Sequence, residues 1–269
     1  MEDNIIFKHY MEEYEDKRSK KVFVTLVYVL LAVFLTFFCI NIAFQQSYRY
    51  IIINGASMQN TINPNPVGAN QVQDGVYIKL TQDVDYGDIV VVDKEDEEGS
   101  IIKRLLAFGG DKISIVSVEL EDGSSSYRLL RIKKGTSSVE VVEEDYIKSY
   151  KLWNTSVPYV PDNGVNYEYN FYQNYVKNKS VSYYTFQGQS IAFSTIPEGH
   201  MFYMGDNRSA SYDARQTGTH STSLIIGKVV VIARNAATLE NSPFCWLYQL
   251  KAYFSIIWEE LVDYFAVKV

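Results

Sequence analysis

Three short segments carry side chains that could do chemistry together. They are residues 55–62 (GASMQNTI), 102–111 (IKRLLAFGGD) and 205–215 (GDNRSASYDAR). The first offers the hydroxyl of Ser57 and the second the amine of Lys103. A Ser-Met pair or a lysine in a strand is common, so each segment alone is weak evidence. Together they contain the two groups that one form of nucleophilic catalysis needs.

Lys103 is placed where it would lose its charge most easily. It alternates with Ile101 and Leu105 on one face of a predicted strand, so its amine is directed toward an apolar surface. Burial disfavours the ammonium form. Lowering the pKa from about 10.4 to roughly 8 would raise the neutral fraction at about pH 7 from about one in 2,500 to about one in ten. A neutral amine can take the proton of a serine hydroxyl, which is Ser-Lys catalysis.

Other catalytic groups are less well supported. A Ser-His-Asp triad would need His200, in a predicted strand, or His220, in a predicted turn, and both are more typical of surface or packing residues. A thiol enzyme would need Cys245, which lies beside Trp246 on an apolar helix face. The sequence has no Gly-rich phosphate loop and no metal-ligand spacing of His, Cys and carboxylates, so it predicts no cofactor.

The chemistry needs a scaffold, and the surrounding sequence predicts short strands. Runs of β-branched residues are separated by turns that contain Gly and Asp. The predicted strands are 76–80, 89–92, 101–108, 113–118, 200–204 and 225–233. We expect a mainly β fold in which 45–111 and 200–238 form a twisted antiparallel catalytic domain. Residues 112–199, rich in Tyr, Asn and Ser, are predicted to be a β-rich cap inserted into it.

The C-terminal segment, 239–269, is predicted to contain an amphipathic helix. Apolar residues recur there at helical spacing, at Trp246, Leu250, Tyr253, Ile257, Leu261 and Tyr264. Lys251 and Glu259 interrupt it too closely for a membrane span. Lying at a membrane interface and docking onto protein both remain open.

A different apolar run precedes the strands. Val22 to Phe44 is free of charged residues over 23 positions, and a helix of that length spans roughly 34 Å, enough for a bilayer core of about 30 Å. A cleaved signal peptide would have a shorter apolar run ending in a small-residue site. The sequence therefore predicts a transmembrane helix at 22–44.

The charges beside this run predict its orientation. Lys17, Arg18, Lys20 and Lys21 precede it, whereas only Arg49 follows closely. The positive-inside rule then places residues 1–21 in the cytoplasm and the rest of the chain outside.

Composition excludes some classes of partner. The chain has 269 residues and a net charge of −7, without the basic footprint of a nucleic-acid binder. Its two cysteines, Cys39 and Cys245, lie in the predicted membrane helix and near the far end of the chain, so no disulfide framework is indicated.

The order of these features resembles the bacterial type I signal peptidases, or leader peptidases, which are membrane-anchored serine proteases with a Ser-Lys dyad. The matching boxes are an N-terminal anchor, the Ser-Met pair, Tyr86-Gly-Asp-Ile-Val-Val91, the Lys-Arg strand ending in Gly-Asp, and the Gly-Asp-Asn-Arg loop with Gly227-Lys228 after it. Five boxes in one order are far more specific than any single one.

The resemblance implies roles for individual residues. Ser57 would be the nucleophile and Lys103 the general base. Ser211 matches a loop serine that hydrogen-bonds the lysine and orients it. Gly205 matches a glycine that lets this loop approach the lysine closely.

Further roles follow from the same resemblance. Asp213 and Arg215 match a structural ion pair behind the site, and Met58 and Ile102 match residues lining the pockets for small side chains at positions −1 and −3. The Ser57 backbone N–H would hold the oxyanion. Gly55 has no hydroxyl, so a second oxyanion donor that some members supply there is missing.

Several residues depart from the family pattern. Asn60 stands where the family has proline, Gly109 precedes Gly110-Asp111 where proline is usual, and Ser209 and Ala210 replace the usual Asp-Asn. None of these changes removes a catalytic atom. They allow a divergent specificity or reduced activity.

The expected function is removal of signal peptides from membrane-held preproteins at the outer face of a bacterial cytoplasmic membrane. The expected partners are those substrates and the lipid bilayer. Two alternatives remain: a non-proteolytic module in pilus or surface assembly, and a Ser-Lys protease with a few specialised substrates. The sequence indicates neither the oligomeric state nor the purpose of the cap.

Overall fold

The computed structural model describes residues 2–59, 61–63, 73–94, 99–119, 125–144, 146, 171–177, 179–208, 210–234 and 251–258. The chain divides into two compact units, Met1–Tyr48 and Arg49–Val269. The departures at Asn60 and Ser209, and the cysteine at Cys245, lie outside the described residues.

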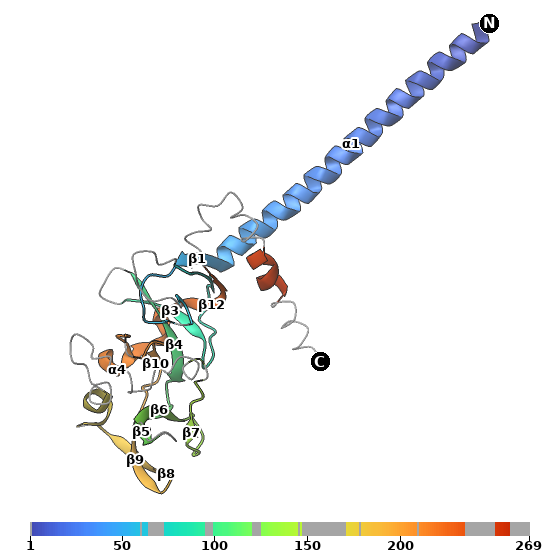
Figure 1. Cartoon of the computed structure of the whole chain (residues 1–269). Helices are drawn as coiled ribbons and strands as arrows, with labels where there is room; N and C mark the ends of the chain where they lie inside the picture. The colour runs from blue at the N-terminus through green and yellow to red at the C-terminus, as the bar shows by residue number, and fades with distance from the viewer. Residues whose placement is uncertain are drawn as a thin grey trace. The chain divides into compact units, whose positions relative to one another are not determined.

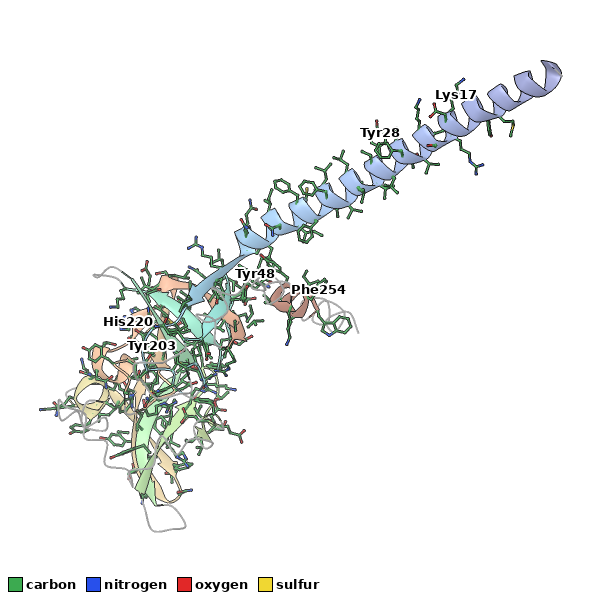
Figure 2. All side chains as sticks on the ribbon, turned by 45° about the horizontal axis from the view of Figure 1, so that its top comes forward. Lys17, Tyr28, Tyr48, Tyr203, His220 and Phe254 are labelled. Atoms are coloured by element: carbon green, nitrogen blue, oxygen red, sulfur yellow. The ribbon has the colours of Figure 1, made fainter. Side chains whose placement is uncertain are left out.

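The first unit is one helix, α1, which runs without a break from Glu2 to Ser47 (Figure 1). It contains the predicted span 22–44. The segment Asp16–Ser47 is long and apolar enough to cross a bilayer, and its most apolar 18 residues have a mean hydropathy of 2.7. Apolar side chains such as Tyr28 are exposed along it (Figure 2). A helix that is apolar on all sides must be buried in protein or lipid, so α1 is consistent with a membrane anchor.

The larger unit contains a seven-stranded sheet with the order β1-β2-β12-β3-β4-β10-β11. Its strands are β1 (Tyr48–Ile52), β2 (Gly75–Lys79), β3 (Ile89–Asp93), β4 (Ser100–Phe108), β10 (His200–Met204), β11 (His220–Ser221) and β12 (Ile225–Ala233). The neighbours from β2 to β11 are antiparallel. The late strand β12 lies between β2 and β3, so early and late parts of the chain share one sheet, as predicted.

A second sheet is built entirely from residues between 112 and 199. Its order is β7-β6-β5-β9-β8, with β5 (Lys112–Glu119), β6 (Ser125–Ile132), β7 (Glu140–Val141), β8 (Val181–Phe186) and β9 (Gln189–Thr195). We call residues 112–199 the insertion. The prediction of a mainly β, antiparallel fold is confirmed.

The insertion is joined to the first sheet through an apolar core. A short helix, η1 (Tyr172–Val176), follows Phe171, and the rings of Phe171 and Tyr175 meet the ring of Phe202 on β10 edge-on. All three side chains are buried. Aromatic burial of this kind fixes the insertion against the strand that leads into residues 205–215.

A C-terminal helix is present at 251–258, inside the predicted segment. Its buried side chains are Ala252 and Ile256, whereas Ile257 is 40% exposed. The prediction placed Tyr253 and Ile257 at the centre of the buried face, so the observed face is rotated by about one residue. Tyr253 lies at the edge of that face, where it is half-buried near the ring of Tyr77.

Candidate active site

Strand β4 brings Lys103 to Ser57. The Lys103 Nζ lies 2.9 Å from the Ser57 Oγ and donates to the Ile102 carbonyl oxygen at 3.0 Å. The Lys103 side chain sits deep in the protein, with the residue only 4% exposed. Its backbone pairs with Val90 on β3. Two groups that are 46 residues apart in sequence are thus in hydrogen-bond contact.

Burial controls the charge of this lysine. Desolvation lowers the pKa of Lys103 from 10.5 to about 8, an effect that Asp213 opposes and Arg215 reinforces. A substantial fraction of the amine is therefore neutral near neutral pH. A neutral amine 2.9 Å from a hydroxyl is placed to accept its proton.

A tight turn holds Ser57. The Gln59 N–H donates to Ala56 O at 3.0 Å, and the Ile62 N–H donates to Met58 O at 2.8 Å. From the other side, the Asn207 N–H donates to Ser57 O at 3.0 Å. The segment 205–208 therefore fixes the backbone of Ser57 directly.

Gly205 makes this contact sterically feasible. A Cβ at this position would lie 2.4 Å from Ser57 O and 2.3 Å from Ser211 Oγ. The resemblance implied a close approach to the lysine, but the crowding is against the backbone of Ser57 and against Ser211. Only a residue without a side chain fits between them.

Ser211 forms no hydrogen bond with Lys103 in this structure. It is buried, and its Oγ has no hydrogen-bond partner of normal geometry among the described residues. It lies near enough to the Asp213 carboxylate to help lower that pKa. The orienting role that the resemblance implied for Ser211 stays a prediction, because this structure shows no such hydrogen bond.

Asp213 and Arg215 form the ion pair that the resemblance implied. Arg215 Nε donates to Asp213 Oδ1 and Nη2 donates to Oδ2, both at 2.8 Å. The side chains are almost fully buried. Asp213 Oδ2 also accepts the Gly205 N–H at 3.0 Å, and Arg215 holds the pKa of Asp213 below its usual value against the cost of burial. The pair thus anchors the start of the loop.

Met58 and Ile102 share one buried apolar cluster with Ile53 and Val91. Met58 is 1% exposed and Ile102 is 8% exposed. They lie next in sequence to the nucleophile and the base, respectively. Their role in lining substrate pockets remains a prediction.

Sequence reasoning gave no role to several charged residues around the site. Arg104, beside Lys103, donates to Asp206 Oδ1 at 2.8 Å and Oδ2 at 2.6 Å. Asp206 also accepts from Thr61 Oγ1 at 2.5 Å. Arg208 pairs with Glu144 of the insertion. Arg104, Asp206 and Arg208 lie inside the matched boxes but were given no role of their own, and Glu144 had no sequence signal.

The alternative catalytic groups are placed elsewhere. The His220 ring stacks on Tyr203 with centroids 5.3 Å apart (Figure 2), and the His200 Nδ1 lies 3.1 Å from Glu198 O. Neither histidine is a hydrogen-bond partner of Ser57 or Lys103. In the described part of the chain, no three His, Cys, Asp or Glu residues gather as a metal site would require.

Comparison with known proteins decides the family. The sequence profile described as signal peptidase, peptidase S26, matches residues 20–233. The chain belongs to this signal peptidase family. It is therefore a serine peptidase, a hydrolase of the kind that cleaves signal peptides. The matched residues include all three boxes that meet at the site, whereas the helix at 251–258 lies beyond them.

Individual signal peptidases are similar to the chain at modest identity. Signal peptidase I U of Bacillus subtilis is 27% identical over 212 residues, which cover 78% of this chain and 86% of that protein. Signal peptidase I of Streptococcus pneumoniae is 28% identical over 149 residues, covering 54% and 66%. A crystal structure of a signal peptidase I from Enterococcus faecalis is 20% identical, with a TM-score of 0.29, and covers 55% of this chain and 97% of that one.

One departure from the signal peptidase pattern has a local explanation. A Cβ at Gly109 would lie 2.7 Å from Pro197 O and 2.8 Å from Glu198 Cα. The ring of a proline would meet the same atoms. Glycine at 109 therefore suits the close approach of the 197–199 turn in this chain.

Proposed function

We propose that this protein is a membrane-anchored endopeptidase that removes signal peptides from secreted preproteins, with Ser57 as nucleophile and Lys103 as general base. One observation carries the proposal: the buried Lys103 Nζ lies 2.9 Å from the Ser57 Oγ. Family membership supplies the reaction class, and this contact supplies the two reacting groups.

The proposed reaction has two halves. Neutral Lys103 accepts the Ser57 hydroxyl proton while Oγ attacks the carbonyl carbon of the scissile bond. The resulting ammonium then gives its proton to the leaving amine as the C–N bond breaks, which leaves an acyl-enzyme. A water molecule, deprotonated by Lys103, then attacks the ester carbonyl carbon, and the Lys103 ammonium returns the proton to Ser57 Oγ as the C–Oγ bond breaks.

The oxyanion of the tetrahedral intermediate needs a donor. The backbone N–H of Ser57 donates no hydrogen bond within the described residues, so it is free to donate to the substrate. Gly55 lacks a hydroxyl for a second bond. In related active sites, loss of one oxyanion donor raises the activation barrier by about 2.7 to 4 kcal/mol.

The proposed substrate is a preprotein held in the membrane by its signal peptide. The proposed cleavage after small residues at −1 and −3 is carried over from the family resemblance, which assigns the substrate pockets to Met58 and Ile102, next in sequence to the two reacting groups. The basic residues before the apolar part of α1 support a cytoplasmic N-terminus and a catalytic unit outside. The bacterial cytoplasmic membrane is the proposed location.

The test is cleavage of a preprotein in proteoliposomes by wild type, Ser57→Ala and Lys103→Ala. We expect both variants to lose activity by several orders of magnitude, as removal of a nucleophile or base does in other serine proteases. Full activity of either variant would overturn the dyad. N-terminal sequencing of the products distinguishes general signal-peptide removal from specialised cleavage elsewhere in a protein.

Acylation separates an enzyme from a binding module. A serine-reactive inhibitor should label wild type and leave Ser57→Ala unlabelled. A wild-type protein that is neither labelled nor active would favour the non-proteolytic assembly module instead.

A further inference from the structure

A buried ion pair connects the insertion to the segment that holds Ser57. Arg208 Nη2 donates to Glu144 Oε1 of the insertion, and the two side chains are only 2% and 5% exposed. The Tyr146 hydroxyl completes the group, because it accepts from Arg208 Nη2 at 3.2 Å and donates to Glu144 Oε1 at 3.0 Å. Charge-assisted bonds that exclude water hold their partners firmly.

Arg208 passes this contact on toward the nucleophile. Its Nε donates to Gly205 O at 2.9 Å. The stretch from Gly205 to Arg208 includes Asn207, whose N–H donates to Ser57 O at 3.0 Å. Gly205 itself is packed against the Ser57 carbonyl oxygen. A shift of Arg208 would therefore move the atoms that fix Ser57.

Tyr146 makes a second connection, toward the base. The Arg104 guanidinium lies over the Tyr146 ring, 3.9 Å from its centroid. Arg104 follows Lys103 on β4 and grips Asp206 through two hydrogen bonds. The insertion thus contacts both the strand of the base and the segment beside the nucleophile.

The insertion also holds the other end of the loop. Asn174 Nδ2 donates to Arg215 O at 3.0 Å and to Gln216 O at 2.8 Å. The Tyr175 hydroxyl donates to Ala214 O at 2.7 Å. These carbonyls lie on α4 (Ala214–Thr217), which Asp213 caps. The loop is therefore gripped before and after Ser211.

We propose that Glu144 is a positioning residue of this peptidase, and that through Arg208 the insertion clamps residues 205–215 in the geometry that brings Ser57 to Lys103. This role of Glu144 rests on the proposed function, because it is measured through peptidase activity. Glu144 touches neither reacting group, so its effect must pass through Arg208.

The charges explain why Glu144 cannot be replaced freely. Two arginines and two acids are packed together: Arg104 with Asp206, and Arg208 with Glu144. Loss of the Glu144 carboxylate leaves the Arg208 guanidinium buried without its counter-charge, and such a group rearranges toward water or other acceptors. Small displacements of a catalytic group have large effects on rate.

The experiment compares Glu144→Ala with the matched control Glu140→Ala in the full-length protein. Glu140 is also an insertion carboxylate paired with a buried arginine, since Arg131 Nε donates to it at 2.6 Å. Among the described residues, neither Glu140 nor Arg131 forms a hydrogen bond or ion pair with 205–215. Active sites are counted by titration with the serine-acylating inhibitor, and kcat is given per titrated site. We expect Glu144→Ala to lower kcat by roughly tenfold to a hundredfold with little change in KM, and Glu140→Ala to keep the wild-type kcat.

Two milder variants separate positioning from folding. Glu144→Gln keeps an oxygen that can accept from Arg208 but removes the counter-charge, so its kcat should lie between those of Glu144→Ala and wild type. Tyr146→Phe keeps the ring under Arg104 but removes the hydroxyl, so it should lower kcat to a smaller extent while remaining folded.

Two outcomes would overturn the clamp. One is a wild-type kcat per site in Glu144→Ala, whatever the result with Tyr146→Phe. The other is a loss only in the number of titrated sites, which would mean that Glu144 serves folding alone. Absence of activity in wild type would instead overturn the proposed function, so the two failures are distinguishable.

Discussion

At the residue scale, the environment of Lys103 controls the pH range in which this lysine can serve as the proposed general base. Desolvation makes the largest contribution to its low pKa, and the nearby Asp213 and Arg215 act in opposite directions. The effects of Asp213 and Arg215 therefore oppose each other, and burial accounts for the lowered pKa of Lys103. A lysine with a pKa of about 8 is partly neutral near neutral pH, so it can accept a proton, and it is also partly charged.

The pH dependence of activity should report this pKa. We expect kcat/KM to rise with pH through a midpoint of about 8, because only the neutral Lys103 can accept the Ser57 proton. The measurement is kcat/KM against pH with a substrate that does not titrate in this range. A flat profile between about pH 6 and 10 would contradict Lys103 as the base.

The low pKa of Lys103 should also make the folded protein less stable at neutral pH than it would be without this lysine. The folded pKa of about 8 lies below that of an unfolded lysine, so below about pH 8 the folded protein carries the penalty of a buried ammonium. Lys103→Met should remove activity yet raise the free energy of unfolding at about pH 7, by up to about 3 kcal/mol.

This gain should shrink as pH rises from about 8 to about 10.5. In that window the folded wild type has lost a proton that its unfolded chain still binds, so wild-type stability increases. Urea denaturation at about pH 7 and pH 10 measures both differences. Lys133→Met, at a half-exposed lysine of the insertion, is the control and should show little pH-dependent difference.

At the scale of elements, the site is a meeting of one strand, one turn and one loop. Strand β4 supplies Lys103, the turn after β1 supplies Ser57, and the loop after β10 presses Gly205 against the Ser57 carbonyl. None of these elements holds the geometry alone. The loop is held at Asp213 by Arg215 and at Arg208 by the insertion.

Gly205→Ala should damage catalysis through crowding. The new Cβ would lie 2.4 Å from Ser57 O, so the turn must shift, and we expect kcat to fall by about a hundredfold. Gly135→Ala is the control: its φ of +79° makes alanine strained, but nothing lies within 4 Å of the added atom. The control should lose about 1 kcal/mol of stability and keep its kcat. Equal kcat in both variants would argue against the crowding.

At the scale of the whole molecule, a long apolar helix precedes a β unit that carries the reacting groups. Under the proposed function this order would let a membrane-anchored peptidase meet preproteins that are held in the same bilayer. The anchor and its flanking charges predict which side the β unit occupies.

Topology can be measured with single-cysteine variants. In a background of Cys39→Ser and Cys245→Ser, Tyr183→Cys on β8 and Tyr14→Cys on α1 place thiols at exposed positions. A membrane-impermeant maleimide should label Tyr183→Cys in bacterial cells with an accessible outer face, and Tyr14→Cys only after lysis. The reverse pattern would contradict the proposed orientation.

Much of the architecture could be predicted because its signals are local. The apolar run at 22–44 needs only composition. β10 and β12 agree with their predicted ranges because runs of aromatic and apolar residues in β10, and of β-branched residues in β12, lie between turns. The short strand β11 at His220, predicted as a turn, escaped because two residues carry too little pattern. β7 is equally short, whereas β6 and β9 are longer but were missed because their polar and apolar residues alternate only weakly.

The sequence by itself determined the long apolar helix and the mainly β character, and it indicated Ser57 and Lys103 as candidate reacting groups, since each signal depends on residues close together in the chain. Only the tertiary structure decided that Lys103 meets Ser57 at 2.9 Å, that Gly205 crowds Ser57 O, and that Glu144 pairs with Arg208. Such contacts join distant residues through packing, and a buried ion pair is specified by three-dimensional proximity rather than by any spacing along the chain.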